Sequence, residues 1–416
     1  MKTRKNMHNG GFGGRAARVS VILLCVAASP QIAHSANASC RTTGTFAGWK
    51  ADFRAEAVAA RISPETLRDA FDPIVFDPNI IRRDRRQSFF SLSFVDFSKR
   101  LVSSNRMKTG ARKLQQRAEW FRKAEKTYGV PGPVIAAFWA LESDFGVGIS
   151  KQSLIFNSLA TLAYDCRRPE MFRRELLAAL KIVDREYLPL SGMTGSWAGE
   201  IGQTQFLPSH YLNYALDADR DGRRDMIKSD PDIIMSTANY IKHLGWRAGE
   251  PWLEEVRAPK RMPWQEADLG IYHPRSKWAA WGVTTREGGR IKADATEASL
   301  LLPMGRNGPA FLAYRNFAIY PHWNQSLNYA ITAAYLATRL DGAPAYRAGN
   351  GPIENYGYKQ IKDIQSLLSA RGFDTGGTDG KMGAKTRAAV KAAQLKHRLP
   401  ADSYPSLDLV EYLRRR

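Results

Sequence analysis

The amino-acid sequence predicts a mainly α-helical protein with an additional α/β lobe and a small separate module at its C-terminal end. Apolar residues recur at spacings of three and four between about Phe46 and Arg339, as they do on the buried face of a helix. Residues 250–320 instead contain proline, glycine and short β-rich runs, which predict an irregular lobe inserted between helices. A stretch rich in glycine, proline and asparagine, residues 342–355, separates residues 356–416 from the rest.

Two helices have the clearest signals. The first is predicted over Ala111–Tyr128, with a stop signal in Gly129 and Pro131 and an apolar stripe at Leu114, Ala118, Phe121 and Ala124. The second is predicted over Pro133–Phe145, because proline stands near its start and glycines follow its end.

Length and charge limit the class of protein. At one domain per about 100–200 residues, a chain of 416 residues suggests two or three domains. A hydrophobic content of 44% with 24% charged residues excludes wholesale disorder. The formal net charge of +21 predicts an anionic partner, which could be nucleic acid, anionic lipid or an acidic polymer.

The first residues have the order of a secretory signal peptide. A basic segment without acidic residues precedes an apolar run, Val19–Ser29, and small residues follow up to Ala38. We therefore predict a signal peptide over residues 1–38 and a periplasmic mature protein. The run is too short to cross a hydrocarbon core of about 30 Å, and Asn37 replaces the aliphatic residue of a lipidation motif, so no membrane span or lipid anchor is predicted. Export also argues against nucleic acid and favours an anionic polymer as the partner.

Two cysteines, Cys40 and Cys166, remain after the predicted cleavage. Because exported proteins meet an oxidising compartment, we predict one disulfide between them. This bond would tie the N-terminal arm to the loop at Cys166.

Glu142 is the candidate acid. It lies one turn after Phe138 and Trp139, near the end of the second predicted helix. A carboxyl group in an apolar setting keeps its proton to higher pH and can deliver it near neutrality. Spacing alone, however, favours a solvated acid on the helix surface. Asp144 would point away from Glu142 and is a poor second catalytic acid.

Three aspartates, Asp217, Asp219 and Asp221, form the D-x-D-x-D-G opening of an EF-hand calcium loop. The loop departs from that pattern because its twelfth residue is Lys228 rather than glutamate. Asp232 could supply the closing carboxylate if the loop is longer. A surface turn without metal is the alternative.

The segment Ser196–Phe206 mixes small, amide and aromatic residues. Sugars are bound by such residues, with aromatic faces against C–H surfaces and amides on hydroxyl and N-acetyl groups. A tightly packed glycine-rich turn explains the same composition equally well.

Four motifs, ALESDFG, SWAGEIGQTQFLPSHY, DADRDGRRD and WNQSLNYA, occur in the order and spacing of one known family. With DRRQ at 84–87 and LLPMGRNGPAFLAY at 301–314, the chain resembles the lytic murein transglycosylase B family from about Cys40 to Leu340. The resemblance implies a lysozyme-like helical core with further lobes and an EF-hand-like structural calcium site. It also implies cleavage of the MurNAc–GlcNAc β-1,4 bond of peptidoglycan, without a catalytic metal or organic cofactor.

The same resemblance assigns roles to individual residues. Glu142 matches the family's single catalytic acid and base. The positions that match the sugar groove are Ser196, Gln205, Asn324 and Tyr329. The positions that match the calcium ligands are Asp217, Asp219, Asp221, Arg223 through its backbone carbonyl, and Asp232.

The tail resembles a second unit, the peptidoglycan-binding module of three short helices. It has an I-x-x-I-Q-x-x-L helix, a D-G-x-x-G-x-x-T turn and a helix ending A-x-x-A-Q. We therefore predict a catalytic domain over residues 39–342, a flexible linker over 343–355 and a peptidoglycan-binding domain over 356–416.

The expected protein is an exported, monomeric lytic transglycosylase that cuts glycan strands without water and leaves 1,6-anhydro-MurNAc ends. A hydrolytic muramidase is the alternative enzyme. A non-catalytic peptidoglycan-binding protein is the alternative of a different class, although a binder has no need of a carboxyl group in an apolar setting.

Overall fold

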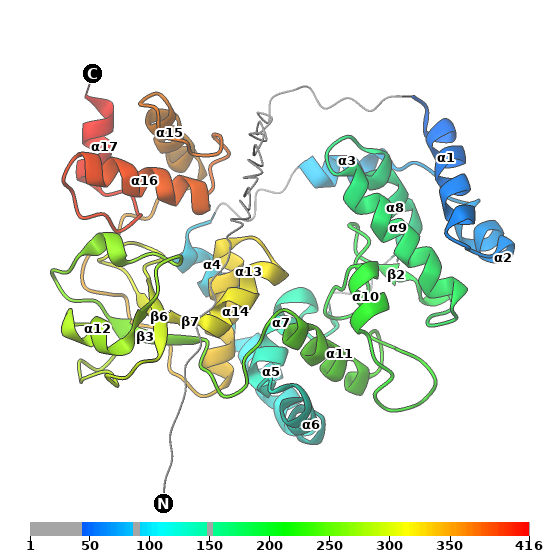
Figure 1. Cartoon of the computed structure of the whole chain (residues 1–416), viewed down its shortest axis with the longest axis horizontal. Coiled ribbons are helices and arrows are strands. Elements are labelled where there is room, and N and C mark those ends of the chain that lie inside the picture. Colours follow the sequence, from blue (N-terminus) through cyan, green and yellow to red (C-terminus); the bar gives the residue numbers. More distant parts are fainter. Residues whose placement is uncertain (1–43, 86–91, 148–152, 416) are drawn as a thin grey trace, which may run out of the picture. The chain divides into compact units, whose positions relative to one another are not determined.

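The computed structural model describes residues 44–85, 92–147 and 153–415 (Figure 1). The predicted fold class is confirmed: a helical core, a lobe built on a small sheet and a C-terminal module of three helices. The predicted signal peptide lies outside these residues. None of the helices in the described ranges combines the length and apolar character that crossing a bilayer requires.

Helices form the core of the molecule. Its elements are α1 (Phe46–Ala59), α2 (Pro64–Thr66), α3 (Pro78–Arg85), α4 (Phe94–Leu101), α5 (Ser104–Gln116), α6 (Ala118–Tyr128), α7 (Gly132–Ser143), α8 (Ile155–Tyr164), α9 (Pro169–Asp184), α10 (Pro208–Tyr214), α11 (Asp230–His243), α13 (Ile319–Trp323) and α14 (Leu327–Leu340). A two-stranded antiparallel pair, β1 (Ser153–Leu154) and β2 (Thr194–Gly195), joins the start of α8 to the loop before α10. Helix α7 packs against α5 and α14, so it lies inside the core.

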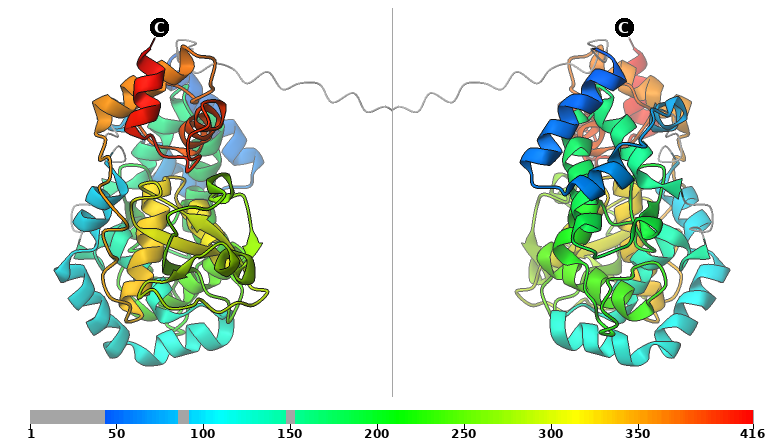
Figure 2. Two further views of the ribbon diagram at one scale, coloured as in Figure 1. Left: turned by 90° about the vertical axis from the view of Figure 1, so that its left-hand side faces the viewer. Right: turned by 90° about the vertical axis from the view of Figure 1, so that its right-hand side faces the viewer.

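The helix predicted over Ala111–Tyr128 is two helices. The chain bends at Arg117, where ψ is 26°, between α5 and α6 (Figure 2). The bend lets α5 pack on α7 while α6 packs on α11. Arg117 and Lys113 both reach the buried Asp230 at the start of α11, at 2.7 and 2.8 Å. The predicted stop is confirmed at Gly129, which has φ 72°.

The predicted lobe holds a five-stranded antiparallel sheet in the order β4-β6-β7-β3-β5. Its elements are β3 (Leu253–Arg257), β4 (His273–Pro274), α12 (Arg275–Ala280), β5 (Thr284–Thr285), β6 (Glu297–Leu301) and β7 (Ala310–Tyr314). The central strand β7 is buried along its whole length. Leu300 stands opposite Leu312, and both pack with Trp278 in a second hydrophobic core.

The C-terminal module consists of α15 (Tyr358–Ser369), α16 (Ala384–Lys396) and α17 (Leu407–Arg414). The two glutamines of its motif are buried and structural. Gln365 accepts from the Gly380 amide at 2.7 Å and donates to Asp379 at 2.9 Å, which fixes the D-G turn. Gln394 donates to Asp402 at 2.8 Å and accepts from the backbone amide of Ser403 at 3.1 Å, so it holds the loop before α17.

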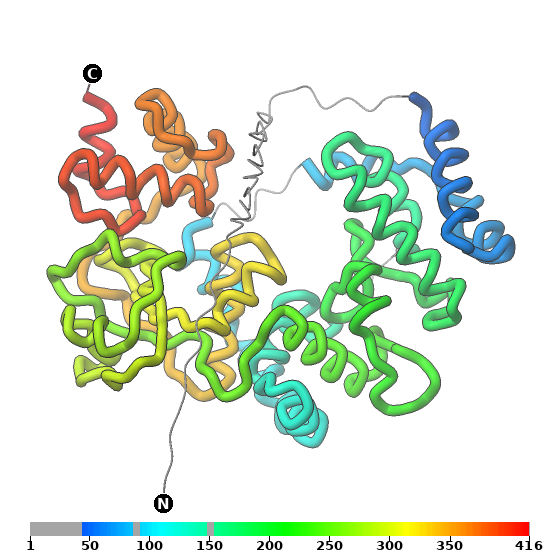
Figure 3. Tube along the Cα trace, viewed as in Figure 1, coloured from blue at the N-terminus to red at the C-terminus, as the bar shows by residue number. Residues whose placement is uncertain are grey.

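Residues 343–355, the predicted linker, make several specific contacts with the rest of the protein. They form no helix or strand, but they pack along the sheet lobe (Figure 3). The Tyr346 ring lies 4.9 Å from the Tyr335 ring and 5.5 Å from the Phe94 ring. The Arg347 amide donates to Glu255 at 2.7 Å, and the Asn350 amide donates to a carbonyl of the lobe at 2.8 Å.

The module is docked on the sheet lobe by three cationic side chains. Arg387 of α16 donates to the carbonyl of Leu302 at 2.7 Å, and its burial lowers the pKa of the guanidinium. Lys391 of the same helix pairs with Asp268 at 2.9 Å. In the other direction, Arg306 of the lobe pairs with Asp402 of the module at 3.2 Å. The described residues of the core, the lobe and the module accordingly belong to one compact unit.

Candidate active site

Helix α7 is apolar on all its faces, which makes it a core helix rather than an amphipathic surface helix. Pro131 precedes its first turn, and it ends where Asp144 and Phe145 take positive φ values of 53° and 58°. The buried side chains before Glu142 are Val134, Ile135, Ala136, Ala137, Phe138, Trp139 and Ala140. Glu142 is thus delivered to an apolar environment by a helix that has no polar face.

Glu142 keeps some solvent access, yet it is not the solvated surface acid that spacing alone favours. Burial raises the pKa of its carboxyl group to about 7, and the nearby Glu200 contributes in the same direction. Asp144 is turned away, as predicted, and pairs with Arg106 at 3.2 Å. Glu142 can therefore hold a proton near neutral pH and release it to a bound group.

One oxygen of Glu142 accepts two hydrogen bonds. The hydroxyl of Tyr329, in the first turn of α14, and the indole Nε1 of Trp323, the last residue of α13, both donate to Oε1, the latter at 2.9 Å. Burial raises the pKa of Tyr329 well above its usual value, so this hydroxyl stays a donor. The Trp323 ring is itself stacked on Phe138 with centroids 4.2 Å apart. Both donors stabilise the carboxylate that remains after proton transfer.

The loop after β2 carries Ser196 on a tight turn. A Cβ on Gly195 would lie 1.9 Å from the Glu200 carbonyl oxygen. A Cβ on Gly199, whose φ is 83°, would lie 2.2 Å from Leu159 Cδ2, so both positions require glycine. Ser196 Oγ donates to the carboxylate of Glu200 at 2.9 Å. The turn therefore fixes a second carboxyl group whose charge acts on Glu142.

Only one of the four predicted groove residues contacts Glu142 directly, and that residue is Tyr329. Ser196 donates a hydrogen bond to Glu200, and the charge of Glu200 in turn raises the pKa of Glu142. Gln205 has φ 51° and donates to the carbonyl of Gly202 at 2.7 Å. Asn324 directly follows Trp323 and accepts from the amide of Ser326 at 3.0 Å. For these last two residues, the hydrogen bonds within the described ranges are local.

Sequence reasoning missed Trp323 and Glu200. Both stand inside motifs that the sequence singles out, Trp323 in WNQSLNYA and Glu200 in SWAGEIGQTQF. The motif positions could have drawn attention to them. Their approach to Glu142 is tertiary and has no signal in local spacing.

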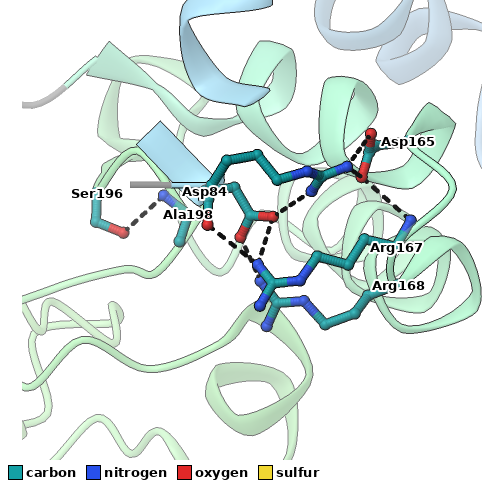
Figure 4. A network of polar contacts seen from close by, with 7 residues as sticks. Asp84, Asp165, Arg167, Arg168, Ser196 and Ala198 are labelled. Atoms are coloured by element: carbon teal, nitrogen blue, oxygen red, sulfur yellow. Dashed lines mark hydrogen bonds and ion pairs between the residues drawn. The ribbon is translucent and has the colours of Figure 1, made fainter. Parts of the chain in front are cut away.

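A network of arginines and aspartates lies beside the Ser196 turn (Figure 4). Asp84, of the DRRQ motif at the end of α3, accepts from Arg167 and Arg168 at 2.7 Å each and from Arg85 at 2.8 Å. Burial opposes its ionisation, but the hydrogen bond from Arg167 and the charges of both arginines hold its pKa below the usual value. The last two residues of the motif lie outside the described ranges.

Cys166 lies in the same loop as these arginines and is disulfide-bonded. Its predicted partner, Cys40, lies outside the part of the chain that the structure describes. The pairing Cys40–Cys166 therefore remains a prediction.

The three aspartates of the D-x-D-x-D-G turn come together, with one ligand oxygen from each of Asp217, Asp219 and Asp221 within 4.8 Å of the others. Asp232 is not in this group. Its two oxygens accept the amides of Ala218 at 2.6 Å and Asp225 at 2.7 Å, so it closes the loop. Burial, together with the charges of Asp219 and Asp217, raises the pKa of Asp232 to about 6. The geometry provides a concentrated negative charge that suits a hard cation.

Comparisons with known proteins agree with this geometry. Residues 45–338 match the family model described as the transglycosylase SLT domain, and residues 357–412 match a peptidoglycan binding domain. The membrane-bound lytic murein transglycosylase B of Escherichia coli is 30% identical over 242 residues, which cover 58% of this chain and 65% of that protein. The match thus spans less than two thirds of that relative.

Solved structures show the same fold. SltB3 from Pseudomonas aeruginosa, in complex with NAG-anhNAM-pentapeptide, has a TM-score of 0.81 and 37% identity, covering 90% of this chain and 100% of that chain. The Escherichia coli lytic transglycosylase Slt35, in complex with calcium, has a TM-score of 0.59 and 26% identity, covering 70% of this chain and 92% of that chain. The predicted resemblance and the lysozyme-like fold class are confirmed. Because the family model covers most of the chain, the protein belongs to the transglycosylase SLT domain family.

Proposed function

We propose that this protein is an exported lytic transglycosylase that cleaves the MurNAc–GlcNAc β-1,4 bond of peptidoglycan without water. The observation that carries the proposal is Glu142, a half-buried carboxyl group at the end of an apolar helix whose pKa is raised by desolvation to about 7. The match of residues 45–338 to the transglycosylase SLT domain supports the reaction class. SltB3, a structural neighbour, was solved with a fragment that contains an anhydro sugar.

The proposed reaction uses Glu142 twice. The protonated carboxyl group gives its proton to the bridging oxygen as the bond from that oxygen to C1 of MurNAc breaks. The N-acetyl group of MurNAc stabilises the oxocarbenium-like centre. The Glu142 carboxylate, which accepts hydrogen bonds from Tyr329 and Trp323, then takes the proton of the MurNAc C6 hydroxyl. The hydroxyl oxygen forms a bond to C1 at the same time. The products are a free GlcNAc hydroxyl and a 1,6-anhydro-MurNAc end, and no water is consumed.

The mass of the released fragments tests this proposal. Purified sacculi should yield muropeptides with 1,6-anhydro ends, which are lighter by one water than reducing ends. Reducing ends would indicate the alternative, a hydrolytic muramidase. This alternative has a structural basis, because ordinary glycosidases use two carboxyl groups and Glu200 is a second one near Glu142. Absence of any cleavage would leave a peptidoglycan-binding protein.

We expect cleavage to decline as the pH rises through about 7. The reaction needs Glu142 protonated, and burial raises its pKa from 4.5 to about 7. Below that pH most of Glu142 is protonated, and above it the protonated fraction falls about tenfold per pH unit. A profile of kcat/KM against pH on soluble glycan fragments would show this alkaline limb. A limb near pH 4.5 would show that Glu142 is not desolvated in the free enzyme.

We propose that the sugar is held by Ser196, Gln205, Asn324 and Tyr329, and that the tail binds the wall polymer. The match of residues 357–412 to a peptidoglycan binding domain supports the second role. After removal of residues 1–38, 56 Lys and Arg remain against 40 Asp and Glu, a formal charge of +16 that suits a polymer whose stem peptides carry carboxylates. Periplasmic location after cleavage of residues 1–38, a Cys40–Cys166 disulfide and a monomeric state complete the proposal.

The proposal includes a structural calcium ion on Asp217, Asp219 and Asp221, with Arg223 as a carbonyl ligand and Asp232 at the loop's closing position. The convergence of three carboxylates supports it, and so does the calcium in the Slt35 structure. The ion would hold the loop between α10 and α11. The chemistry at Glu142 needs no metal, since none of these ligands is part of that site.

Calcium should therefore raise the melting temperature, and a chelator should lower it. At about 100 times the dissociation constant, a ligand that binds only the folded state contributes about 2.7 kcal/mol. Scanning calorimetry with and without calcium would measure the shift, and Asp219→Asn should reduce it. Asp374→Asn, which changes an exposed aspartate of the module, is the matched control and should leave the shift intact. Equal melting temperatures in calcium and in chelator would exclude the site.

A further inference from the structure

Glu200 is an ionisable group of the site to which neither the family resemblance nor the proposed reaction gives a role. It lies in the turn after β2, and protein surrounds its carboxyl group enough for burial to raise its pKa. Four groups act on it from four segments: Ser196 in its own turn, Glu142 of α7, Tyr329 of α14 and Arg168 before α9. Glu200 thus interacts electrostatically with both Glu142 and the cation Arg168.

Ser196 makes three hydrogen bonds inside its own turn. A serine hydroxyl has one donor and two acceptor positions. Ser196 Oγ donates to Glu200 Oε2 at 2.9 Å and accepts the amides of Ala198 at 3.1 Å and Glu200 at 3.3 Å. The direction of the hydroxyl proton is therefore set by the Glu200 carboxylate. A sugar that meets Ser196 meets a hydroxyl whose donor is already engaged.

The two carboxyl groups have different surroundings. Glu200 accepts a donor and feels the positive charge of Arg168. Glu142 accepts hydrogen bonds from two uncharged donors, and the charge of Glu200 helps to raise its pKa. When two carboxyl groups interact, the group with a cationic neighbour ionises first, and its charge then disfavours loss of the second proton. Glu200 is therefore the anion of the pair, and Glu142 is the acid.

We infer that Glu200 is a positioning residue of the cleavage: its carboxylate directs the Ser196 hydroxyl and places a negative charge beside Glu142. The inference rests on the proposed function of Glu142 as the proton donor. It holds for either product, anhydro or reducing, because both reactions begin with protonation of the bridging oxygen.

The test compares Glu200→Gln with the wild-type full chain on soluble glycan fragments over a range of pH. Glutamine keeps the size and the acceptor oxygen but removes the charge. The alkaline limb of kcat/KM should move to lower pH by about half a unit or more, because Glu142 then loses its proton more easily. Activity on the acid side of the profile should change much less than activity at pH 8.

Glu175→Gln is the matched control. Desolvation raises the pKa of Glu175, as it does that of Glu200, and Glu175 also accepts from a serine hydroxyl, Ser209, at 2.9 Å. It is not among the groups that act on Glu142. This variant should lower the melting temperature and leave the alkaline limb in place. If removal of any desolvated carboxyl group had this effect, the alkaline limb would move in both Glu200→Gln and Glu175→Gln.

Ser196→Ala gives a second arm if Glu200→Gln fails to fold. This variant keeps the Glu200 carboxyl group but removes its hydrogen-bond donor, so Glu200 ionises at higher pH. Less negative charge then acts on Glu142 near neutral pH, and the alkaline limb should move to lower pH by a smaller amount than in Glu200→Gln. An alkaline limb that stays in place in either folded variant overturns the inference. The result is separable from the proposed function, which fails only if the wild-type enzyme releases reducing ends or no fragments.

Discussion

Glu142→Gln is expected to lower glycan cleavage by about 10²–10⁴-fold, the usual range for loss of a general acid and base. Glutamine preserves the acceptor for Tyr329 and Trp323, but it has no proton to transfer at any pH. Release of soluble muropeptides from sacculi measures the effect. Binding to sacculi should be unchanged, because the module of residues 357–412 is intact.

The folding control for this variant has a defined sign. A buried carboxyl group with a raised pKa favours the protonated folded state, so wild-type stability falls as the pH rises from about 4.5 towards 7. Glutamine has no charge to bury. The variant should therefore melt at a similar temperature at pH 4 and at a higher temperature than wild type at pH 8.

Asp144→Asn is the matched activity control. Asp144 stands two residues from Glu142, but it pairs with Arg106, and its φ of 53° is one that asparagine tolerates. Its activity should stay within a few-fold of wild type. Substantial cleavage by Glu142→Gln, or an equal loss in Asp144→Asn, would place the acid elsewhere.

The sequence was most informative where the chemistry depends on local order. Proline near the start and glycines after the end predict the helix that carries Glu142, and the alternating aspartates predict a turn that gathers Asp217, Asp219 and Asp221. Short β-rich runs separated by glycine and proline predict a lobe at 250–320 with irregular connections. The five-stranded sheet confirms this lobe. In each case residues close in sequence determine the feature.

Features that depend on distant residues could not be predicted. Trp323 lies 181 positions from Glu142, and only the packing of α13 on α7 brings them together. The break at Arg117 has the same cause, because α5 and α6 bury their apolar stripes against different helices. Local periodicity continues through Arg117, so it predicts one helix.

Residues 343–355 combine irregular structure with specific contacts that their composition does not reveal. Glycine, proline and asparagine favour an irregular chain, and the segment is irregular. Irregular structure is nevertheless compatible with close packing when individual side chains find partners. Tyr346 does so among aromatic rings, and its hydroxyl hydrogen-bonds with Ser98 at 2.9 Å. The segment is therefore part of the compact unit.

Removing residues 356–416 is expected to weaken binding to sacculi by about 10²–10⁴-fold, the range by which a second binding element raises the avidity of the first. The cut leaves 343–355 in place, because the half-buried Tyr346 packs against the core. Pull-down by sacculi at low and high salt measures the loss. Digestion of sacculi should slow, while cleavage of soluble glycan fragments should stay near normal because Glu142 and its partners all precede residue 340.

Docking of the module adds a second effect that must be separated from binding. Its removal uncovers the carbonyl of Leu302 and leaves Asp268 without Lys391, so the truncated protein should also melt at a lower temperature. The double variant Arg387→Gln, Lys391→Gln retains the module but removes these contacts. If the tail acts by binding the polymer, the double variant should keep most of its affinity for sacculi while sharing the lower melting temperature. If the double variant and the truncation lose affinity equally, the docked position itself creates the binding surface. If neither variant loses affinity, the tail does not bind the wall. The truncated protein, which retains Glu142 and its partners, would then account for all the binding observed.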